Sequence, residues 1–586
     1  MKKYNRFKNN ILKNKRKFFV YILLFFCLIF FVSCKNYSKW QEEKFVFNEN
    51  KLSYKEDVKN AKMLAPFIKK ENNSNVVYQV LVYSFADGNN DGIGDFIGLK
   101  EKINYFVDLK IDQIYLSPIH PSSSYHGYDV INYTEVAKEL GGKEAFLDFL
   151  KTAHENGIKV YMDMVFNHTS FEHPWFQQAL KGEEKYKNFY HFYDNKVNDS
   201  NQDTRELRDI FINLKDKNPT NHFYTSKFWA GMPDLNLDNS EVIEELKAIQ
   251  KYWTKLGVDG FRYDAFDEFF SSYGESQNNF TTSKIFYELR KASNEGLKET
   301  NQNDKEIFMM GEWWKNPLEA KKYFTYQNNK ALDTVYDSTH WKNNWFINKN
   351  INEIQNFLKE YKPNEWVPFL SNHDNDRWIN SYRTNVSKLF VNDLDKPLTN
   401  DEKEAIKSAY FALLIHPAKP IIYHGDELGM HANKKFGDPG LREPFKWKNS
   451  KYNVSFSEAK SNDKIFLNFS NDIENVENQI NNKDSIYNTI KFLNEFRGKN
   501  PFLFSSDNKT ISNANEYIDN KNIAVTFIRN DLKNEKKFLF LYTNGKIKND
   551  ELILKKQYKN VVFNYKVKIE NNKIFIKHGS LLILEI

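Results

Sequence analysis

The feature that most constrains the fold of this chain is a repeat of short apolar runs separated by amphipathic helical stretches, which begins at Val76. Strands and helices that alternate in this way form a parallel sheet, because each helix carries the chain back across a face of the sheet. The expected strands are, in chain order, Val76–Phe85, Ile114–Pro118, Lys159–Val165, Gly260–Ala265, Ile307–Trp313, Leu332–Tyr336, Val367–Ser371 and Pro420–Tyr423. Eight strands in such units predict a closed (β/α)8 barrel of the α/β class.

Two stretches do not follow this repeat. The third and fourth expected strands are separated by far more residues than a loop and one helix need. Only 239–256 has the spacing of a barrel helix, so the residues before it predict an inserted subdomain. After a helix expected at Ser485–Arg497, which should stop at Gly498, the chain alternates in short strands. The predicted domains are 76–166 with 239–500 for the TIM barrel, 167–238 for the inserted subdomain and 501–586 for a C-terminal β-sandwich.

The N-terminus predicts export. Residues 1–33 hold eight Lys or Arg and no acid, and their apolar segment Phe18–Val32 is short for a membrane span. The segment runs into Ser33-Cys34, which resembles a bacterial lipoprotein processing site. We therefore expect a signal peptide over 1–33, a lipid on Cys34 and a polar spacer over 34–75; an uncleaved signal anchor is the alternative. Either one would tether the protein to the membrane on its extracytoplasmic side.

Charge and cysteine content exclude two other features. The full chain has 84 Lys and Arg, of which eight lie in residues 1–33 and 76 outside them. Against 77 Asp and Glu, residues 34–586 therefore have a net charge of −1. No basic surface for nucleic acid is expected from this balance. Cys27 and Cys34 both belong to the N-terminal segment, so no disulfide is expected in the folded part.

For the oligomeric state, we expect a monomer.

Acidic side chains lie at the ends of four expected strands. The four segments are DMVFNH at 163–168, GFRYDA at 260–265, GEWW at 311–314 and SNHDND at 371–376. Active sites of (β/α)8 barrels form at the carboxyl ends of the strands, so these carboxylates should converge on one rim. An isolated pair such as Arg262 and Asp264 could be a structural ion pair, but four converging carboxylates would repel one another in a passive fold.

Converging carboxylates among aromatic residues favour glycoside hydrolysis. One carboxyl with a raised pKa acts as the acid, another attacks as the nucleophile, and aromatic rings stack on sugar faces. Metal-dependent hydrolysis would favour histidine ligands at closer spacing. The sequence has no motif for a serine or cysteine nucleophile or for a phosphate-binding loop.

Taken together and in this order, the four segments resemble the motifs of glycoside hydrolase family thirteen, the α-amylase family, over Val76–Ile586. The resemblance implies that Asp264 is the nucleophile, Glu312 the general acid and base, and Asp374 a third carboxylate that holds sugar hydroxyls. It also implies a retaining mechanism through a covalent glycosyl ester on Asp264.

The resemblance further implies a set of residues that bind the reacting sugar. Arg262 would keep Asp264 ionised, because a neighbouring cation lowers the pKa of a carboxyl, and Asp163 would orient Arg262. Tyr128 would stack on the sugar, and three histidines would bind its hydroxyls. These histidines are His126, His168 and His373.

Other segments bear on the substrate. The form of SYHGYD at 124–129, with His126, resembles amylases that cut internal α-1,4 links of starch and maltodextrins. MPDLN at 232–236 is intermediate between the oligo-1,6-glucosidase and neopullulanase groups. An exo-α-glucosidase, a cyclomaltodextrinase or neopullulanase, and a glucanotransferase therefore stay open. A non-catalytic membrane-anchored relative is the remote alternative. Asp267-Glu268 stands where amylases often have Lys-His, which leaves open the contact to the leaving group and the usual calcium ligand.

A different calcium site is predicted after the first strand. The segment DGNNDGIGD at 87–95 places oxygen-bearing side chains at alternate residues, with glycines that permit a tight turn. It resembles the calcium loop of the oligo-1,6-glucosidase group. The implied ligands of this structural Ca²⁺ are Asp87, Asn89, Asp91, the carbonyl of Ile93 and Asp95. Magnesium and a metal-free Asp/Gly-rich turn are the alternatives.

Overall fold

Eight parallel strands form the centre of the molecule. The computed structural model describes residues 51–586 except 64–65, 71–73, 195–206, 210–221, 271–278, 339–364, 386, 388, 390–395, 435–436, 456–472, 506–507, 509–510, 521–522, 544–546 and 548. The strands are β1 (Val77–Val80), β2 (Gln113–Leu116), β3 (Lys159–Met164), β7 (Gly260–Tyr263), β8 (Phe308–Gly311), β11 (Thr334–Asp337), β12 (Trp366–Pro368) and β13 (Ile421–Tyr423). They follow the order β12-β11-β8-β7-β3-β2-β1-β13. A parallel bridge between Phe369 and Ile421 joins the two ends, so the predicted (β/α)8 barrel is confirmed.

Successive side chains along each strand point to opposite faces, so the core of the barrel has two parts. One set of side chains fills the interior of the barrel and forms its own cluster: Val77, Tyr115, Tyr161, Met310, Tyr336, Val367, Phe369 and Ile421. Their neighbours along the strands, such as Tyr78 and Ile114, belong to the larger cluster that packs with the surrounding helices. Both faces of each strand are therefore buried, as expected of a parallel sheet covered by helices.

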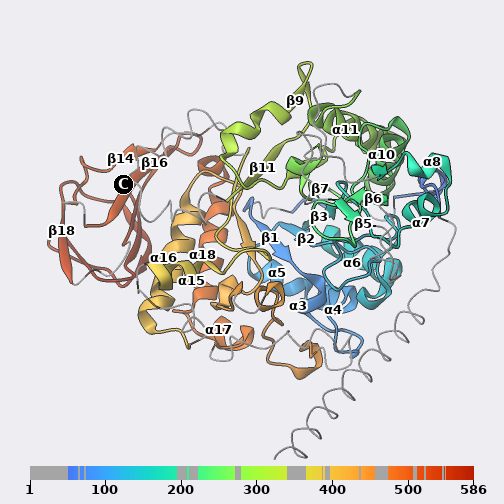
Figure 1. Ribbon diagram of the computed structural model, residues 1–586. Coiled ribbons are helices and arrows are strands. Elements are labelled where there is room, and N and C mark those ends of the chain that lie inside the picture. Colours follow the sequence, from blue (N-terminus) through green and yellow to red (C-terminus); the bar gives the residue numbers. More distant parts are fainter. Residues whose placement is uncertain are drawn as a thin grey trace, which may run out of the picture.

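Helices surround the strands (Figure 1). They are α4 (Phe96–Glu101), α5 (Ile103–Asp108), α6 (Gly142–Glu155), α10 (Ser240–Leu256), α11 (Thr282–Glu299), α15 (Trp378–Asn385), α16 (Asn400–Ile415), α17 (Val476–Asn481) and α18 (Ile486–Lys499). The expected helix before the fourth strand is α10. Its N-cap Asn239 accepts a hydrogen bond from the backbone N–H of Glu241, and Gly257 ends it in the left-handed conformation at φ 118°. The helix expected at Ser485–Arg497 continues through Gly498 to Lys499 as α18.

The first strand is shorter than predicted. It ends at Val80, and Val82–Phe85 forms the single helical turn α3. A continuous apolar run does not distinguish a buried strand from a buried helical turn, so this change could not be predicted from the pattern of residues. The turn is held in place because Gly94 donates its backbone N–H to the carbonyl of Tyr83.

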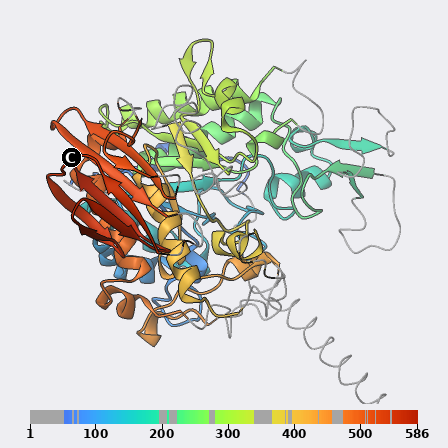
Figure 2. The same ribbon diagram turned by 90° about the vertical axis from the view of Figure 1, so that its left-hand side faces the viewer.

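The inserted subdomain follows β3. It contains α7 (Pro174–Leu180), α8 (Glu184–Lys187) and an antiparallel sheet of β4 (Phe192–Asp194), β6 (His222–Thr225) and β5 (Leu207–Asp209), in that order. Figure 2 shows this sheet on the side of the barrel opposite to the C-terminal domain. Isolated bridges from His168 to Asp234 and from Tyr190 to Leu235 fasten its two ends together.

The C-terminal domain consists of two sheets. The five-stranded sheet has the order β14 (Ser512–Asn513), β16 (Val525–Asp531), β17 (Lys536–Tyr542), β22 (Leu581–Glu585), β19 (Asn560–Tyr565). The four-stranded sheet has the order β15 (Ile518–Asp519), β18 (Asp550–Leu554), β21 (Lys573–Ile576), β20 (Lys568–Glu570). Leu539 and Leu541 of β17 join the core shared by both sheets. Phe538 and Phe540, which alternate with them, pack toward the barrel near Phe496. The expected C-terminal all-β domain is thereby confirmed, and most of β17 and β22 in the five-stranded sheet is buried on both faces.

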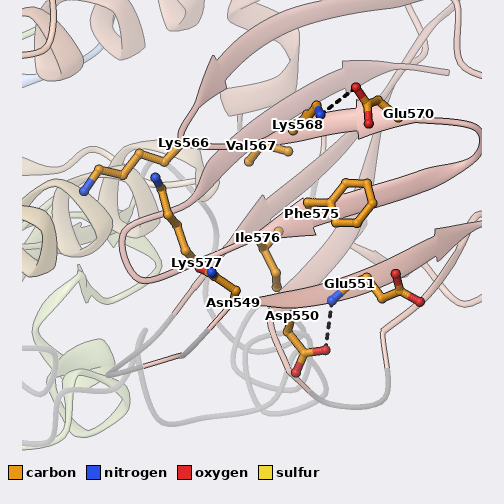
Figure 3. A pocket seen from close by; sticks show the side chains of 10 residues that line it. All are labelled: Asn549, Asp550, Glu551, Lys566, Val567, Lys568, Glu570, Phe575, Ile576 and Lys577. Atoms are coloured by element: carbon orange, nitrogen blue, oxygen red, sulfur yellow. Dashed lines mark hydrogen bonds and ion pairs between the residues drawn. The ribbon is translucent and has the colours of Figure 1, made fainter.

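A hollow of about 730 Å³ lies on the outer face of the four-stranded sheet of this domain (Figure 3). Phe575 stands in it, opposite Glu551 on β18 and Lys568 on β20. The hollow is lined only by residues of the C-terminal domain, which carries none of the four acidic strand ends, so it is not the catalytic cleft.

Part of the predicted polar spacer is folded onto the barrel. Tyr54 is completely buried, and its hydroxyl lies 3.0 Å from His173 Nε2 at the start of the inserted subdomain. Its backbone N–H donates to Glu245 on α10 at 2.8 Å, and α2 (Lys55–Asn60) packs on the same helix. The spacer prediction is therefore wrong for this part, because its scattered apolar residues, Tyr54 above all, find a buried site that only the assembled barrel provides.

The signal peptide and Cys34 lie outside the described residues, so the export and lipidation predictions stay predictions. Within the part of the chain that the structure describes, no helix is both long enough and apolar enough to cross a bilayer.

Replacing Tyr54 by alanine tests the packing of the N-terminal segment. We expect Tyr54→Ala to reduce the free energy of unfolding by about 3 to 5 kcal/mol, since a large buried ring is removed. Tyr54→Phe should cost less, about 1 to 3 kcal/mol, since the hydroxyl contacts His173 and accepts from the N–H of Tyr133, and both buried groups lose this partner. Urea unfolding measures both variants, with Tyr558→Ala on the C-terminal surface as the control. Equal stability of Tyr54→Ala and the unchanged protein would show that residues 51–61 do not pack as described.

Candidate active site

A fully buried arginine is the centre of the rim. Arg262 lies on β7 directly opposite Asp163 on β3. Its Nη1 donates to Asp163 Oδ1 at 2.8 Å and to Asp264 Oδ1 at 2.7 Å, and its Nη2 lies 3.1 Å from Glu312 Oε1. One guanidinium therefore contacts three carboxylates that come from three neighbouring strands, as the planar fork of arginine permits.

Backbone hydrogen bonds fix the positions of Asp264 and Glu312, which directly follow β7 and β8. The N–H of Asp264 donates to the carbonyl of Met164 on β3, and the N–H of Glu312 donates to the carbonyl of Tyr263 on β7. Both residues thus continue the hydrogen bonding between the strands for one position beyond the strand ends. Ala265 then turns sharply, with a positive φ of 44° that is unusual for alanine.

This turn directs a donor at Glu312. The N–H of Ala265 donates to Glu312 Oε2 at 2.7 Å, and the indole N–H of Trp314 donates to Glu312 Oε1 at 3.0 Å. The strained conformation of Ala265 therefore holds the carboxyl of Glu312 beside that of Asp264.

Burial raises the pKa of both Asp264 and Glu312. Burial, first of all, and then repulsion from Glu312 raise the pKa of Asp264 well above its ordinary value of 3.8, against the opposing effect of Arg262. Burial likewise raises the pKa of Glu312 above 4.5. Both carboxyls therefore hold a proton more readily than exposed carboxyls do, as the acid of a glycoside hydrolase must.

Asp374 stays ionised. Burial alone would raise its pKa, but the cations Arg442 and Arg262 hold the pKa below the ordinary 3.8. Arg442 Nη2 donates to Asp374 Oδ1 at 3.0 Å, and His373 Nε2 lies 3.2 Å from Asp374 Oδ2. The third carboxylate is therefore an anion that can accept hydrogen bonds from sugar hydroxyls.

The predicted sugar-binding residues gather at the same rim. The rings of Tyr128 and His373 are parallel, with their centroids 5.5 Å apart, and the hydroxyl of Tyr128 also donates to Asp163 at 3.2 Å. His168 Nε2 lies 3.0 Å from the carbonyl of Tyr128. Burial lowers the pKa of His168 to about 4 and the pKa of both His126 and His373 to about 3, so all three histidines are neutral hydrogen-bonding groups at neutral pH.

Sequence reasoning missed Arg442. It follows the last barrel strand and reaches back to the rim, where it donates to the carbonyl of His373 and the hydroxyl of Tyr125, both at 3.0 Å. The one available signal was its position after β13, at the carboxyl end of the barrel. Trp314, although within the GEWW motif, was likewise not assigned a contact to Glu312.

The unusual acidic pair Asp267-Glu268, which follows Asp264, is neutralised by lysines from other segments. Lys227 of the inserted subdomain lies 3.2 Å from Glu268, and Lys315 after β8 lies 3.5 Å from Asp267. The acidic pair is thus balanced by two cations from other segments, and the place where amylases often have Lys-His carries no net positive charge from these four side chains.

The predicted calcium loop forms a compact turn. Asp87 accepts hydrogen bonds from the N–H groups of Asn90 and Gly92, Asp91 accepts one from Ile93, and Asp95 caps α4. Across the described ranges, no group of three or more His, Cys, Asp or Glu side chains is arranged to hold a metal ion. The donor set of carboxylate, amide and carbonyl oxygens is of the type that calcium prefers, so the loop fits calcium by chemistry, although its carboxylates here accept hydrogen bonds from backbone N–H groups.

The site defines the class of protein. Two buried carboxyls with raised pKa values, a third carboxylate and a wall of aromatic and neutral histidine side chains at the mouth of a (β/α)8 barrel suit a retaining glycoside hydrolase. Residues 79–506 match the family model described as the catalytic domain of α-amylase. The chain therefore belongs to the α-amylase family.

Individual relatives agree with this assignment. The chain is 31% identical to α-amylase 3 of Dictyoglomus thermophilum over 87% of its own length and 93% of that protein. It is 32% identical to a 4-α-glucanotransferase of Thermotoga neapolitana over 63% and 75% of the two chains. Among solved structures, an α-amylase from H. orenii superposes with a TM-score of 0.65 at 25% identity, over 87% of this chain and 99% of the other.

Glu312→Gln tests the role assigned to this residue. The amide keeps the shape of the side chain but has no proton to give, so we expect kcat to fall by about 10²- to 10⁴-fold while α-glucan binding persists. Turnover of a soluble maltodextrin and binding to starch measure the two effects, and Glu551→Gln on the C-terminal domain is the control. Undiminished turnover by Glu312→Gln would remove Glu312 from the mechanism.

Proposed function

We propose that this protein is an α-amylase that hydrolyses internal α-1,4-glucosidic bonds of starch and maltodextrins. The observation that carries the proposal is the contact of Arg262 with Asp163, Asp264 and Glu312, which brings an acid and a nucleophile together. The finer choice of α-amylase is supported by the similarity to α-amylase 3 of D. thermophilum along nearly the whole of both chains.

Each residue then has a definite task in the first step. Glu312 gives its proton to the glycosidic oxygen, while an oxygen of Asp264 attacks the anomeric carbon and displaces the leaving chain. Arg262 favours the ionised form of Asp264, and it is itself held by Asp163. Tyr128, His373 and Asp374 surround the reacting sugar.

In the second step, Glu312 removes a proton from water, and the water oxygen attacks the anomeric carbon. The ester bond to Asp264 breaks, and the sugar leaves with its original α configuration. Two displacements at one carbon therefore account for retention.

A glucanotransferase is the second candidate, favoured by the 32% identity to the enzyme of T. neapolitana. It would use the same ester but give it to another sugar. Products larger than the substrate distinguish this activity from hydrolysis.

Substrates with blocked ends test the internal cut. An enzyme that cuts internal bonds needs no free chain end. We therefore expect a maltoheptaose derivative blocked at its non-reducing end to be cleaved at a rate within about tenfold of the unblocked sugar, a difference of about 1.4 kcal/mol or less. Chromatography of the products from blocked maltoheptaose, amylose and pullulan measures this. Glucose as the sole early product, with no cleavage of the blocked sugar, would instead identify an exo-acting enzyme.

We also propose that the 87–95 loop binds a structural Ca²⁺ through Asp87, Asn89, Asp91, Asp95 and the carbonyl of Ile93. Its role would be to fix the loop against α3 and α4, away from the bond-breaking step. Support comes from the hard oxygen donors and from the compact turn.

Chelation tests the calcium loop. We expect EGTA to lower the melting temperature and added Ca²⁺ to restore it, because a ligand that binds only the folded state stabilises that state. Asp91→Ala should melt at the lower temperature with or without EGTA, whereas Asp148→Ala on α6 should respond like the unchanged protein. Differential scanning calorimetry measures the shift, and an identical melting temperature before and after chelation would rule out a structural metal here.

A further inference from the structure

A buried glutamine lies directly beneath the rim. Gln79 on β1 is 1% exposed, and its neighbours in the strand register are Tyr115 on β2 and Tyr423 on β13. Its backbone carbonyl accepts a hydrogen bond from the N–H of His424 at 3.0 Å. Its side-chain amide nitrogen lies 2.8 Å from Nδ1 of His373, which follows β12. Gln79 therefore joins the first strand of the barrel to one of the predicted sugar-binding residues.

The surroundings of His373 determine which of its ring nitrogens carries the proton. Burial, first of all, lowers the pKa of this histidine to about 3, and a neutral imidazole has one N–H donor and one acceptor nitrogen. Nε2 lies 3.2 Å from Oδ2 of Asp374, which is an anion and can only accept hydrogen bonds. A lone pair on Nε2 would be repelled by this carboxylate. The proton therefore belongs on Nε2, and Nδ1 is the acceptor.

Gln79 matches this arrangement. A glutamine amide has a donor end and an acceptor end, and only its NH₂ group can pair with an unprotonated Nδ1. In a histidine, the hydrogen bond at one ring nitrogen selects which nitrogen carries the proton. The donor of Gln79 at Nδ1 and the carboxylate of Asp374 at Nε2 consequently favour the same tautomer from the two sides of the ring.

Tyr128 continues the same direction of hydrogen bonding. Its hydroxyl oxygen is in hydrogen-bonding contact with Nε2 of His373, and the planes of the two rings differ by only 4°. The hydroxyl donates its own proton to Oδ2 of Asp163 at 3.2 Å, so its oxygen can accept from Nε2–H. Tyr115 donates to the same carboxylate oxygen at 2.5 Å. The hydrogen bonds thus run in one direction, from the amide of Gln79 to the carboxylate of Asp163.

We propose that Gln79 is a positioning residue for the reaction: it orients His373 and keeps its proton on Nε2, so that the ring offers a donor to the reacting sugar. This role rests on the proposed function, since it assumes an α-glucan at the rim. A sugar hydroxyl bound between His373 and Asp374 would accept from Nε2–H and donate its own proton to the carboxylate. With the proton on Nδ1, the same hydroxyl would meet two acceptors and could satisfy only one of them.

Gln79→Glu tests this role, because it keeps the shape of the side chain and adds a group that titrates. While the new carboxyl and His373 share two protons, Nε2–H still faces the sugar. After the loss of one proton, the carboxylate accepts from Nδ1, and Nε2 keeps only a lone pair. The activity of this variant should therefore fall as the pH rises. The charged and titratable groups that face the pair are Asp374, Arg442, Arg262, Lys434, Tyr128, Tyr115, Tyr423 and His424.

The imidazole nitrogens of His373 report the tautomer directly. We expect ¹⁵N NMR of the full chain, labelled at histidine, to show a protonated Nε2 and an unprotonated Nδ1 in the unchanged protein. The signals of His373 are those that disappear in His373→Asn. In Gln79→Glu, the proton should move to Nδ1 as the pH rises. In Gln79→Met, which keeps the volume but removes the amide, Asp374 should still hold the proton on Nε2.

Kinetics on a soluble maltodextrin measure the consequence. Gln79→Met should lower kcat/KM by up to about tenfold at every pH, because His373 loses one hydrogen bond that orients it. Gln79→Glu should approach the unchanged protein at about pH 5 and fall about tenfold or more below it at about pH 9. Gln113→Met removes a buried amide that accepts from Tyr161 at the opposite end of the barrel. It is the matched control and should leave kcat/KM unchanged.

The outcomes separate this role from the proposed function. No cleavage of maltodextrin by the unchanged protein would contradict the hydrolase itself, whereas the NMR result does not depend on turnover. A proton on Nδ1 of His373 in the unchanged protein would overturn the role of Gln79. A ratio of kcat/KM between Gln79→Glu and the unchanged protein that is constant from about pH 5 to about pH 9 would overturn it as well. Melting temperatures show whether each variant is folded. Should Gln79→Glu fail to fold, equal kcat/KM of Gln79→Met and the unchanged protein would overturn the positioning role.

Discussion

The catalytic rim depends on one buried guanidinium. Arg262 has no exposed surface, and its charge is stable there only because Asp163, Asp264 and Glu312 approach it from three adjacent strands. The dependence is mutual, since three carboxylates at this distance would repel one another without the cation. The guanidinium charge is thus shared among three buried carboxylates, two of which, Asp264 and Glu312, have raised pKa values.

The parts outside the barrel serve this rim from several directions. The inserted subdomain supplies Lys227 and Phe228, while the loop after the last strand supplies Arg442. The N-terminal segment fastens the start of the inserted subdomain to α10 through Tyr54. The C-terminal domain packs on α16 and α18 on the far side of the barrel and contributes none of the rim contacts described above.

The barrel and the main site were predictable from local pattern. Eight apolar runs separated by helical stretches lead to few other folds, and acidic residues at strand ends must share one rim because parallel strands end at the same edge. The predictions for the spacer and for the first strand were wrong for one shared reason. The apolar residues of 51–61 and of Val82–Phe85 have no periodicity that reveals which distant surface will bury them.

By itself, the sequence determined that Arg262 and Asp264 lie on one face of a strand and that acidic residues follow the ends of four strands, since alternation along a strand is a local property of the chain. Only the tertiary structure decided what neutralises Asp267 and Glu268, and what closes the rim beside Asp374. Lys315, Lys227 and Arg442 reach these groups from other segments. Charge pairing across loops depends on distances in space, and those distances are fixed only when the barrel closes and the inserted subdomain packs over its mouth.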